Sequence, residues 1–405
     1  MNQLLRSLGP GHYLAVAAFA ILPLSILAPL GIAPLGAVAA VAVIVHRIGT
    51  RRPWPADWRF LTWLVLAFLI WGGMSAFWSL SPERSIETFL RLTAIGVGAV
   101  VLIDTATTLD EAGRRRVSTG LIAGAFVGGF LLGFELISGE IVVGTLYPDM
   151  VSNTVALLNR AASILVIFVW AGAIVFRRRY GIFAAAILIA LCIVATVFLE
   201  PQAPRWAVIA GIGIFGMALW RARLAALMLA AILVAMVACS PFVRDFAPWL
   251  DGELTAHGLN NNSVSHRLGI WHFASDRIVD KPLAGWGLGA VRLIPGGHDD
   301  VTIMGRVIQD APAIPLHPHS ALLQIWAEVG LPGVLIAATI IIALILSVPR
   351  KVAGRFDQAA SLAMTASALT VAQFSYGIWQ GWWLTALWLM AALTIAVIGT
   401  KPRDA

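Results

Sequence analysis

The chain has 405 residues, of which 59% are hydrophobic and only 12% are charged. This composition excludes an ordinary soluble globular protein and is typical of a polytopic membrane protein. The net charge is +7, but no nucleic-acid-binding motif accompanies it, so we attribute the basic excess to membrane topology and expect no nucleic acid partner. The two cysteines, Cys192 and Cys239, lie in or at the end of apolar runs. They indicate neither a disulfide framework nor a thiolate metal site.

Twelve apolar runs follow one another along the chain, and each predicts a membrane-spanning helix. Several are shorter than the ~20 residues that a straight span needs. The second run follows the first at once, without a small-residue cleavage site, which favours a retained helix over a signal peptide. The runs are approximately 13–28, 31–46, 60–78, 87–103, 119–137, 161–176, 181–198, 206–219, 224–239, 333–348, 359–375 and 382–398.

The placement of Lys and Arg predicts the orientation of these spans. If the N-terminus is cytoplasmic, every segment on the cytoplasmic side is basic, as the positive-inside rule expects. This parity also places the C-terminus in the cytoplasm. It divides the chain into nine spans in residues 1–239, one long outer segment at 240–332, and three spans in residues 333–405.

A second set of basic residues is predicted on the outer side of the membrane, and the positive-inside rule does not explain their presence there. Snorkelling to lipid headgroups would explain any single one. Several guanidinium groups at one depth instead suit an anionic ligand such as a diphosphate, because their planar fork binds oxyanions in a bidentate way. The set consists of Arg84, Arg91, Arg160 and Arg205 at span ends, and Arg244, Arg267, Arg277, Lys281, Arg292 and Arg306 in the outer segment.

The outer segment itself has a varied pattern. Residues 251–265 are polar and read as a flexible loop, and residues 265–274 predict an amphipathic helix with Arg267 and Trp271 on one face. Residues 281–289 form a Gly-rich turn; a phosphate-binding loop is the alternative, although no Walker pattern is present. Residues 296–315 read as a mobile loop that could cover a cavity.

The stretch 317–333 concentrates polar groups beside the membrane. Pro318 suits the start of a helix, so we predict a helix from about Ser320 to Val329 that Gly330 stops. One face of that helix carries a polar stripe at i, i+4 and i+8, which we expect to line a cavity. The stripe consists of Ser320, Gln324 and Glu328.

Some signals leave alternatives open. His317 and His319 could form half of a metal site that Asp299, Asp300 or Glu328 would complete, although no His-Glu-x-x-His motif supports it. Glu328 could instead orient His319, bind an acceptor sugar or cap an internal hydrogen-bond network. The aromatic turn 377–383 fits either a membrane-interface belt or sugar stacking.

These motifs resemble those of the O-antigen ligase family. The pair His319-Ser320, followed after nine residues by Gly330 and Gly333, resembles the family signature His-(Asn/Ser/Gln)-x9-Gly-x-x-Gly. One departure is Pro204, because relatives often carry a serine directly before the arginine that Arg205 resembles. The further matching elements are Arg267 with Trp271, the Pro-x-x-Gly-x-Gly turn at Pro282, Gly285 and Gly287, and the Trp-Ser-x-x-Pro element at Trp78, Ser79 and Pro82.

The resemblance implies a fold and a reaction. The fold would be an all-α, GT-C-like membrane protein with about twelve transmembrane helices and a large periplasmic loop that contains short helices. The reaction would transfer a glycan from undecaprenyl pyrophosphate to a sugar of lipid A-core, with inversion and without a metal or other cofactor. It would take place on the periplasmic face of a Gram-negative inner membrane, among membrane lipids.

The resemblance also implies roles for individual residues. His319 is the expected base for the acceptor hydroxyl, because imidazole titrates near neutrality and the following helix start favours its neutral form. Arg205 and Arg267 are expected to hold the diphosphate. The expected substrate-binding residues are Arg84, Arg91, Arg160, His317, Trp271, Gln324 and Glu328.

Other functions share part of this pattern. An O-antigen polymerase or a protein O-oligosaccharyltransferase would use the same donor with a different acceptor. A transporter of a lipid-linked glycan would also need many spans and arginines facing a cavity. A transporter should place polar residues near the bilayer midplane and show repeats between its halves, and the sequence shows neither, which favours the transferase.

Overall fold

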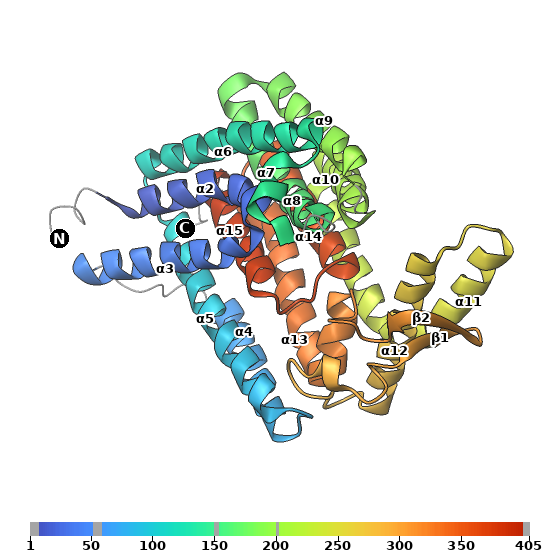
Figure 1. Cartoon of the computed structure of the whole chain (residues 1–405). Helices are drawn as coiled ribbons and strands as arrows, with labels where there is room; N and C mark the ends of the chain where they lie inside the picture. Colours follow the sequence, from blue (N-terminus) through green and yellow to red (C-terminus); the bar gives the residue numbers. More distant parts are fainter. Residues whose placement is uncertain (1–7, 52–58, 150–153, 200–201, 400–405) are drawn as a thin grey trace.

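The computed structural model describes residues 8–51, 59–149, 154–199 and 202–399. Helices dominate, and α11 and a β-hairpin project from the helical bundle beside α12 (Figure 1). The helices are α2 Pro10–Leu27, α3 Ile32–Gly49, α4 Arg59–Met74, α5 Pro82–Thr107, α6 Glu111–Ser138, α7 Ile141–Leu146, α8 Thr154–Tyr180, α9 Ile182–Phe198, α10 Gln202–Cys239, α11 Val243–Ala256, α12 Asn262–Asp280, α13 Ala321–Lys351, α14 Arg355–Phe374 and α15 Gly381–Val397; the strands are β1 Asp300–Ile303 and β2 Arg306–Pro312.

Each of the twelve predicted apolar runs overlaps a helix. Among the described residues, seven helices are long and apolar enough to cross a membrane, and three shorter apolar helices accompany them. Helix α10 covers two predicted runs, which meet where the backbone of Arg221 leaves the helical region (φ −144°, ψ 92°). The prediction of an all-α polytopic membrane protein is therefore confirmed in its coarse form, and the number of spans stays a prediction.

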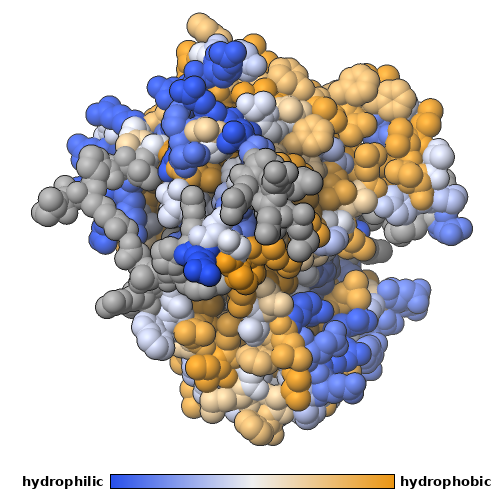
Figure 2. Space-filling view, turned by 90° about the vertical axis from the view of Figure 1, so that its left-hand side faces the viewer, coloured by the Kyte–Doolittle hydropathy of each residue, from blue (hydrophilic) through white to orange (hydrophobic). Residues whose placement is uncertain are grey.

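The surface agrees with this membrane character. Figure 2 shows broad hydrophobic areas on one face of the molecule, with the hydrophilic residues gathered in separate patches. A soluble protein rarely exposes apolar patches of such extent. These areas are therefore suited to contact with lipid.

Helix α8 forms the centre of the bundle. Its residues 161–176 are all buried, and Trp170 is completely inaccessible to solvent. Nearby, α2 and α6 pack so closely at Gly120 that a Cβ atom added there would lie only 2.3 Å from the carbonyl oxygen of Ala15. Small residues at such contacts are the usual means by which membrane helices approach one another.

The predicted helix 320–329 is present, but α13 resumes beyond it. The backbone of Gly330 breaks the helix (φ 67°, ψ −172°), and the Gly-rich turn docks there. Gly287 N–H donates to the carbonyl of Glu328 (2.8 Å), and Leu331 N–H donates to that of Pro282 (2.8 Å). A Cβ on Gly330 would lie 2.0 Å from the carbonyl oxygen of Leu283. The Gly-rich turn is thus a structural partner of the break in α13.

Two predictions for the outer segment were wrong. Residues 251–265 are not a flexible loop, because α11 extends to Ala256 and α12 begins at Asn262. Residues 296–315 are not a loop throughout, because strands β1 and β2 pair there as an antiparallel hairpin; their mobility and their covering of a cavity stay predictions. The small sheet also qualifies the all-α prediction.

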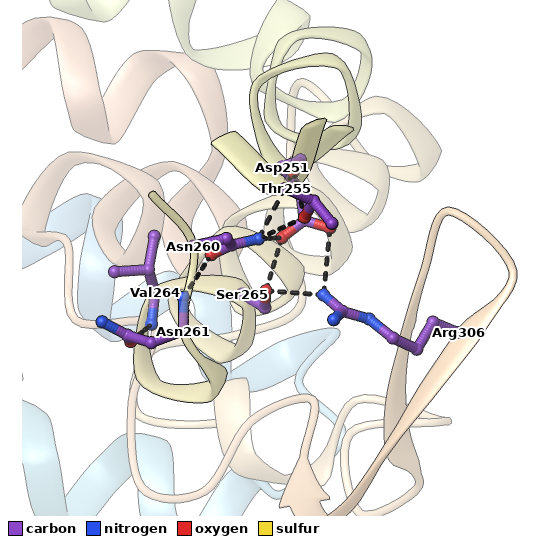
Figure 3. Close-up of polar contacts among 7 residues, drawn as sticks. All are labelled: Asp251, Thr255, Asn260, Asn261, Val264, Ser265 and Arg306. Carbon is purple, nitrogen blue, oxygen red and sulfur yellow. Dashed lines mark hydrogen bonds and ion pairs between the residues drawn. The ribbon is translucent and has the colours of Figure 1, made fainter. Parts of the chain in front are cut away.

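A buried carboxylate explains the order of this region (Figure 3). Asp251, which is 2% exposed, accepts hydrogen bonds from Ser265 Oγ (2.5 Å) and Asn260 Nδ2 (2.7 Å). Arg306 reaches across from the hairpin to Asp251 (3.3 Å) and to Ser265 Oγ (2.7 Å). One carboxylate therefore ties α11, α12 and the hairpin together, which the local sequence pattern does not reveal.

Candidate active site

Helices α10, α12 and α14 enclose a groove of about 920 Å³. Its α12 wall carries polar groups, whereas its α10 and α14 walls are mostly apolar. Trp206 and Ile209 on α10 are more than half exposed (58% and 57%), so the apolar wall is accessible from outside. The groove is lined by Gln202, Ala203, Trp206, Ile209, Ala210, Asn261, Ser263, Val264, Arg267, Leu268, Trp271, Thr370 and Phe374.

Arg267 is the only cationic side chain among the residues that line this groove in the described part of the chain. Burial lowers the pKa of its guanidinium. Within the described residues, that guanidinium makes no hydrogen bond or ion pair, although Arg306 on the nearby hairpin and Arg277 further along α12 both have carboxylate partners. A half-buried arginine without an anionic partner suits a bound oxyanion.

His319 lies close to Arg267 and holds a defined tautomer. Its Nδ1 lies 2.7 Å from the carbonyl oxygen of Ser375, so Nδ1 carries the proton and donates it, which leaves the lone pair on Nε2. Burial lowers the pKa of His319 below the usual 6.5, with further lowering by Arg267 and His266, although the bond to Ser375 opposes this. The imidazole is therefore neutral near pH 7 and can accept a proton.

Two contacts connect His319 to the groove. Trp271, which lines the groove, donates from Nε1 to the carbonyl of Pro318 (3.1 Å). The ring of Trp271 also packs against Phe374, with the centroids 5.9 Å apart, and Phe374 directly precedes Ser375. The segment that carries His319 is thus held against the end of the groove formed by Trp271 and Phe374.

His317 is buried beneath His319. It is 6% exposed, its Nδ1 accepts the backbone N–H of His319 (3.2 Å), and the two ring centroids are 4.3 Å apart. Burial, together with the nearby His319 and Arg292, lowers the pKa of His317 to about 3. The sequence analysis counted Arg292 among the outer basic residues but did not predict its position beside His317, which depends on the fold that follows the Gly-rich turn.

The polar stripe of α13 does not line a cavity, so that prediction was wrong. Glu328 is fully buried and accepts hydrogen bonds from Gly289 N–H (2.5 Å), Trp379 Nε1 (2.5 Å) and Gln324 Nε2 (3.0 Å). The carbonyl oxygen of the Gln324 side chain accepts from Ile378 N–H (3.0 Å). The stripe therefore forms the internal network that was one of the alternatives.

The aromatic turn 377–383 takes part in the same network. Trp379 is 8% exposed, Trp382 is 4% exposed and Trp383 is completely buried. These rings pack inside the protein rather than on its surface. Neither an interface belt nor a sugar-stacking surface is formed by these three side chains in this structure.

Arg205 lies beside the groove but points to another helix end. Its guanidinium donates to the carbonyls of Thr196 (2.9 Å), Val197 (3.0 Å) and Leu199 (2.8 Å). These carbonyls lie at the C-terminal end of α9, where backbone acceptors lack helical partners. Arg205 therefore ties the start of α10 to the C-terminal end of α9, next to the groove residues Ala203 and Trp206.

The other predicted arginines are more dispersed. Arg160 lies over the ring of Trp382 at 5.8 Å, near the turn that supplies the Ser375 carbonyl. Arg84 and Arg91 are exposed on α5, and Arg91 pairs with Glu87 (3.7 Å). None of the three lines the groove.

The possible metal site of His317 and His319 gains no further ligand. Within the ranges that the structure describes, no three His, Cys, Asp or Glu side chains come together to hold a metal ion. Glu328 is engaged by the donors described above, and Asp300 accepts from the backbone of Ala311 (3.0 Å). The described residues near His317 and His319 therefore offer cationic side chains, rather than a cluster of metal ligands, to an anionic ligand.

Known proteins resemble parts of the chain. The O-antigen ligase family model matches residues 203–338, which include Arg205, Arg267 and His319. A Rickettsia conorii protein is 29% identical over 136 residues, which cover 33% of this chain and 32% of that protein. A Rickettsia prowazekii protein is 32% identical over 136 residues, covering 33% of each chain.

A Rickettsia felis protein is 24% identical over 345 residues, covering 82% of this chain and 79% of the relative. All three relatives are named provisionally as polysaccharide ligases. The matched part spans about a third of the length of the first two relatives and most of the third. Residues 203–338 of the chain thus match the O-antigen ligase family, the family that the motifs of the outer segment resemble.

Proposed function

We propose that the protein transfers a glycan from undecaprenyl pyrophosphate to a sugar of lipid A-core. The reaction would take place at the periplasmic face of a Gram-negative inner membrane, with both termini of the protein in the cytoplasm. One observation carries the proposal: a neutral His319, held through Nδ1 by the Ser375 carbonyl, lies near the unpaired Arg267 of the groove wall. This places a proton acceptor beside a binding group for an anion.

The groove suits a lipid-linked donor. Such a donor joins an apolar prenyl chain to a charged diphosphate, and the groove likewise joins the exposed apolar surface of Trp206 and Ile209 to Arg267. The prenyl chain would lie along α10, where it stays in contact with the membrane. The diphosphate would then reach Arg267 without leaving the bilayer edge.

The chemistry follows from these two side chains. The acceptor hydroxyl gives its proton to Nε2 of His319, and its oxygen attacks the anomeric carbon of the donor. The bond between that carbon and the diphosphate oxygen breaks on the opposite face, so the configuration inverts. Arg267 stabilises the charge that develops on the leaving diphosphate. Guanidinium groups can do this without a metal ion, so no cofactor is required in the proposal.

The remaining arginines would act around this centre. Arg205 would contribute to the diphosphate site if its guanidinium exchanged a carbonyl of α9 for a phosphate oxygen. Arg160, Arg84 and Arg91 would attract the anionic groups of donor and acceptor to the outer surface. Gln324 and Glu328 would support the site from inside the protein.

The acceptor distinguishes this proposal from its alternatives. Purified protein would be reconstituted in vesicles with the lipid-linked donor and offered lipid A-core, a second donor molecule or an acceptor peptide, with and without EDTA. We expect transfer to lipid A-core that EDTA does not abolish. Transfer only to the second donor would indicate a polymerase, and transfer only to the peptide a protein-glycosylating enzyme. Movement of the donor across the bilayer without transfer to any acceptor would overturn the enzyme assignment.

A further inference from the structure

His319 has an unusual backbone conformation for a histidine. Its φ is +53°, in the left-handed region, which non-glycine residues rarely adopt and in which they are often found at functional sites. Such a conformation persists only where the surroundings hold it. Contacts with neighbouring residues must therefore hold His319 in this conformation.

The ring of His317 supplies one such contact. The backbone N–H of His319 donates to Nδ1 of His317 (3.2 Å). The ring of His317 packs closely against Gly377 on its other side. A Cβ atom added to Gly377 would lie only 3.0 Å from the Cγ and Cδ2 atoms of that ring. The imidazole thus sits between the 377 turn and the backbone of His319, with little room to move.

The two histidines must hold opposite tautomers. His317 accepts at Nδ1, so a neutral His317 carries its proton on Nε2, whereas His319 donates at Nδ1 to Ser375 and has its lone pair on Nε2. A doubly protonated His317 could not accept the bond. Burial disfavours that protonated state, and the nearby His319 and Arg292 disfavour it further.

We propose that His317 is a positioning residue, which holds His319 in its left-handed conformation through the bond to Nδ1 and so keeps Nε2 of His319 available to the acceptor. This inference rests on the proposed function of His319. It differs from the expectation that His317 binds substrate, because it assigns the essential contact to Nδ1 and to the protein backbone.

Two isosteric substitutions separate these roles. The side-chain oxygen of Asn is two bonds from Cβ, as is Nδ1 of histidine, so Asn can replace Nδ1 as the acceptor. The side-chain oxygen of Gln is three bonds from Cβ, as is Nε2 of histidine, so Gln mimics Nε2 instead. If His317 positions His319, His317→Asn should keep most of the transfer activity, and His317→Gln and His317→Ala should each lower kcat about 10- to 100-fold, as expected when a catalytic group is misplaced. The KM for the donor should stay nearly constant.

The controls keep the result specific. His298→Ala removes an exposed histidine of the same outer segment and should leave transfer unchanged. Gly377→Ala should push the ring of His317 and lower kcat in the same direction as His317→Ala. The acid limb of the pH profile should survive in His317→Asn, because that limb belongs to His319.

The outcomes decide between the proposals. Rescue by Gln rather than Asn, or equal activity of all three His317 variants, would overturn the positioning role. Loss of the acid limb in an active His317→Asn protein would make His317 itself the titrating group and would also overturn it. His319→Ala, measured in parallel, tests the proposed function separately: if that variant stays active, the base assignment fails whatever His317 does.

Discussion

The groove wall of α12 and the polar stripe of α13 are built from similar side chains but differ in their contacts. On the stripe, Glu328 is fully buried and receives three hydrogen bonds from the protein. On the wall, Arg267 is only half-buried and has no partner among the described residues. His319, close to Arg267, uses Nδ1 for its bond to Ser375, and its Nε2 receives no hydrogen bond from the part of the chain that the structure describes.

The comparison teaches where to look for function in this fold. A polar group that is sealed and fully paired stabilises the native structure, since its removal leaves buried donors unsatisfied. A polar group that faces a groove without a partner is available to a ligand. We therefore expect changes on the wall to alter transfer, and changes on the stripe to alter stability.

Apart from the loss of the base His319 itself, the largest expected effect is on the wall. Arg267→Ala should lower transfer about 100- to 1,000-fold, because it removes a preorganised positive group from the leaving diphosphate. Arg267→Lys should recover only part of this, since it keeps the charge but loses the planar fork. The matched control is Arg277→Ala on the same helix, whose partner is Asp280; an equal loss of transfer in this control would remove the distinction between paired and unpaired arginines.

The pH dependence gives a second test of the wall. His319 must be neutral to accept a proton, and burial lowers its pKa below the usual 6.5. Transfer should therefore be at its plateau at pH 7 and fall about tenfold per pH unit only below the lowered pKa. Initial rates between pH 4.5 and pH 8 would measure this. An acid limb centred above pH 6.5 would contradict the assigned environment of His319.

Glu328→Ala tests the stripe. It leaves Gly289 N–H and the side chains of Gln324 and Trp379 without their acceptor, which should lower the free energy of unfolding by about 4 kcal/mol. Thermal unfolding in detergent would show the loss. Transfer by the protein that remains folded should change far less than in Arg267→Ala. If Glu328→Ala instead lost transfer activity with unchanged stability, Glu328 would have a role in the reaction rather than in the structure.

The smallest effect concerns the break in α13. Gly330→Ala should destabilise the fold by about 3 kcal/mol, because its φ and ψ are nearly exclusive to glycine and its Cβ would meet the Leu283 carbonyl. Gly305→Ala is the control: φ is +73°, but a Cβ there meets nothing within 4 Å, so about 1 kcal/mol is expected. Equal effects in the two variants would show that docking of the Gly-rich turn contributes nothing.

Local patterns in the sequence predicted the helices well. Long apolar runs must form helices in a membrane because their backbone groups have no other partners, and each run is helical here. The helix after His319 and its break at Gly330 also follow from local rules for Pro and Gly. Resemblance to a family, rather than periodicity, singled out Arg267 and His319.

Tertiary contacts were harder to predict. The stripe of Ser320, Gln324 and Glu328 has the same spacing whether it faces a cavity or a buried network, so the pattern could not decide between them. Arg306 of the hairpin pairs with the distant Asp251, and Arg205 bonds to the end of a neighbouring helix. These roles are set by residues far away in the chain.

Donor binding and transfer in His319→Ala, measured in the same vesicles, test the assigned chemistry of the groove. The variant keeps Arg267 and should bind the lipid-linked donor with the affinity of the wild-type protein. It should transfer the glycan about 100- to 10,000-fold more slowly, because it lacks the base for the acceptor hydroxyl. Transfer at the wild-type rate by His319→Ala would contradict the assignment of His319 as that base.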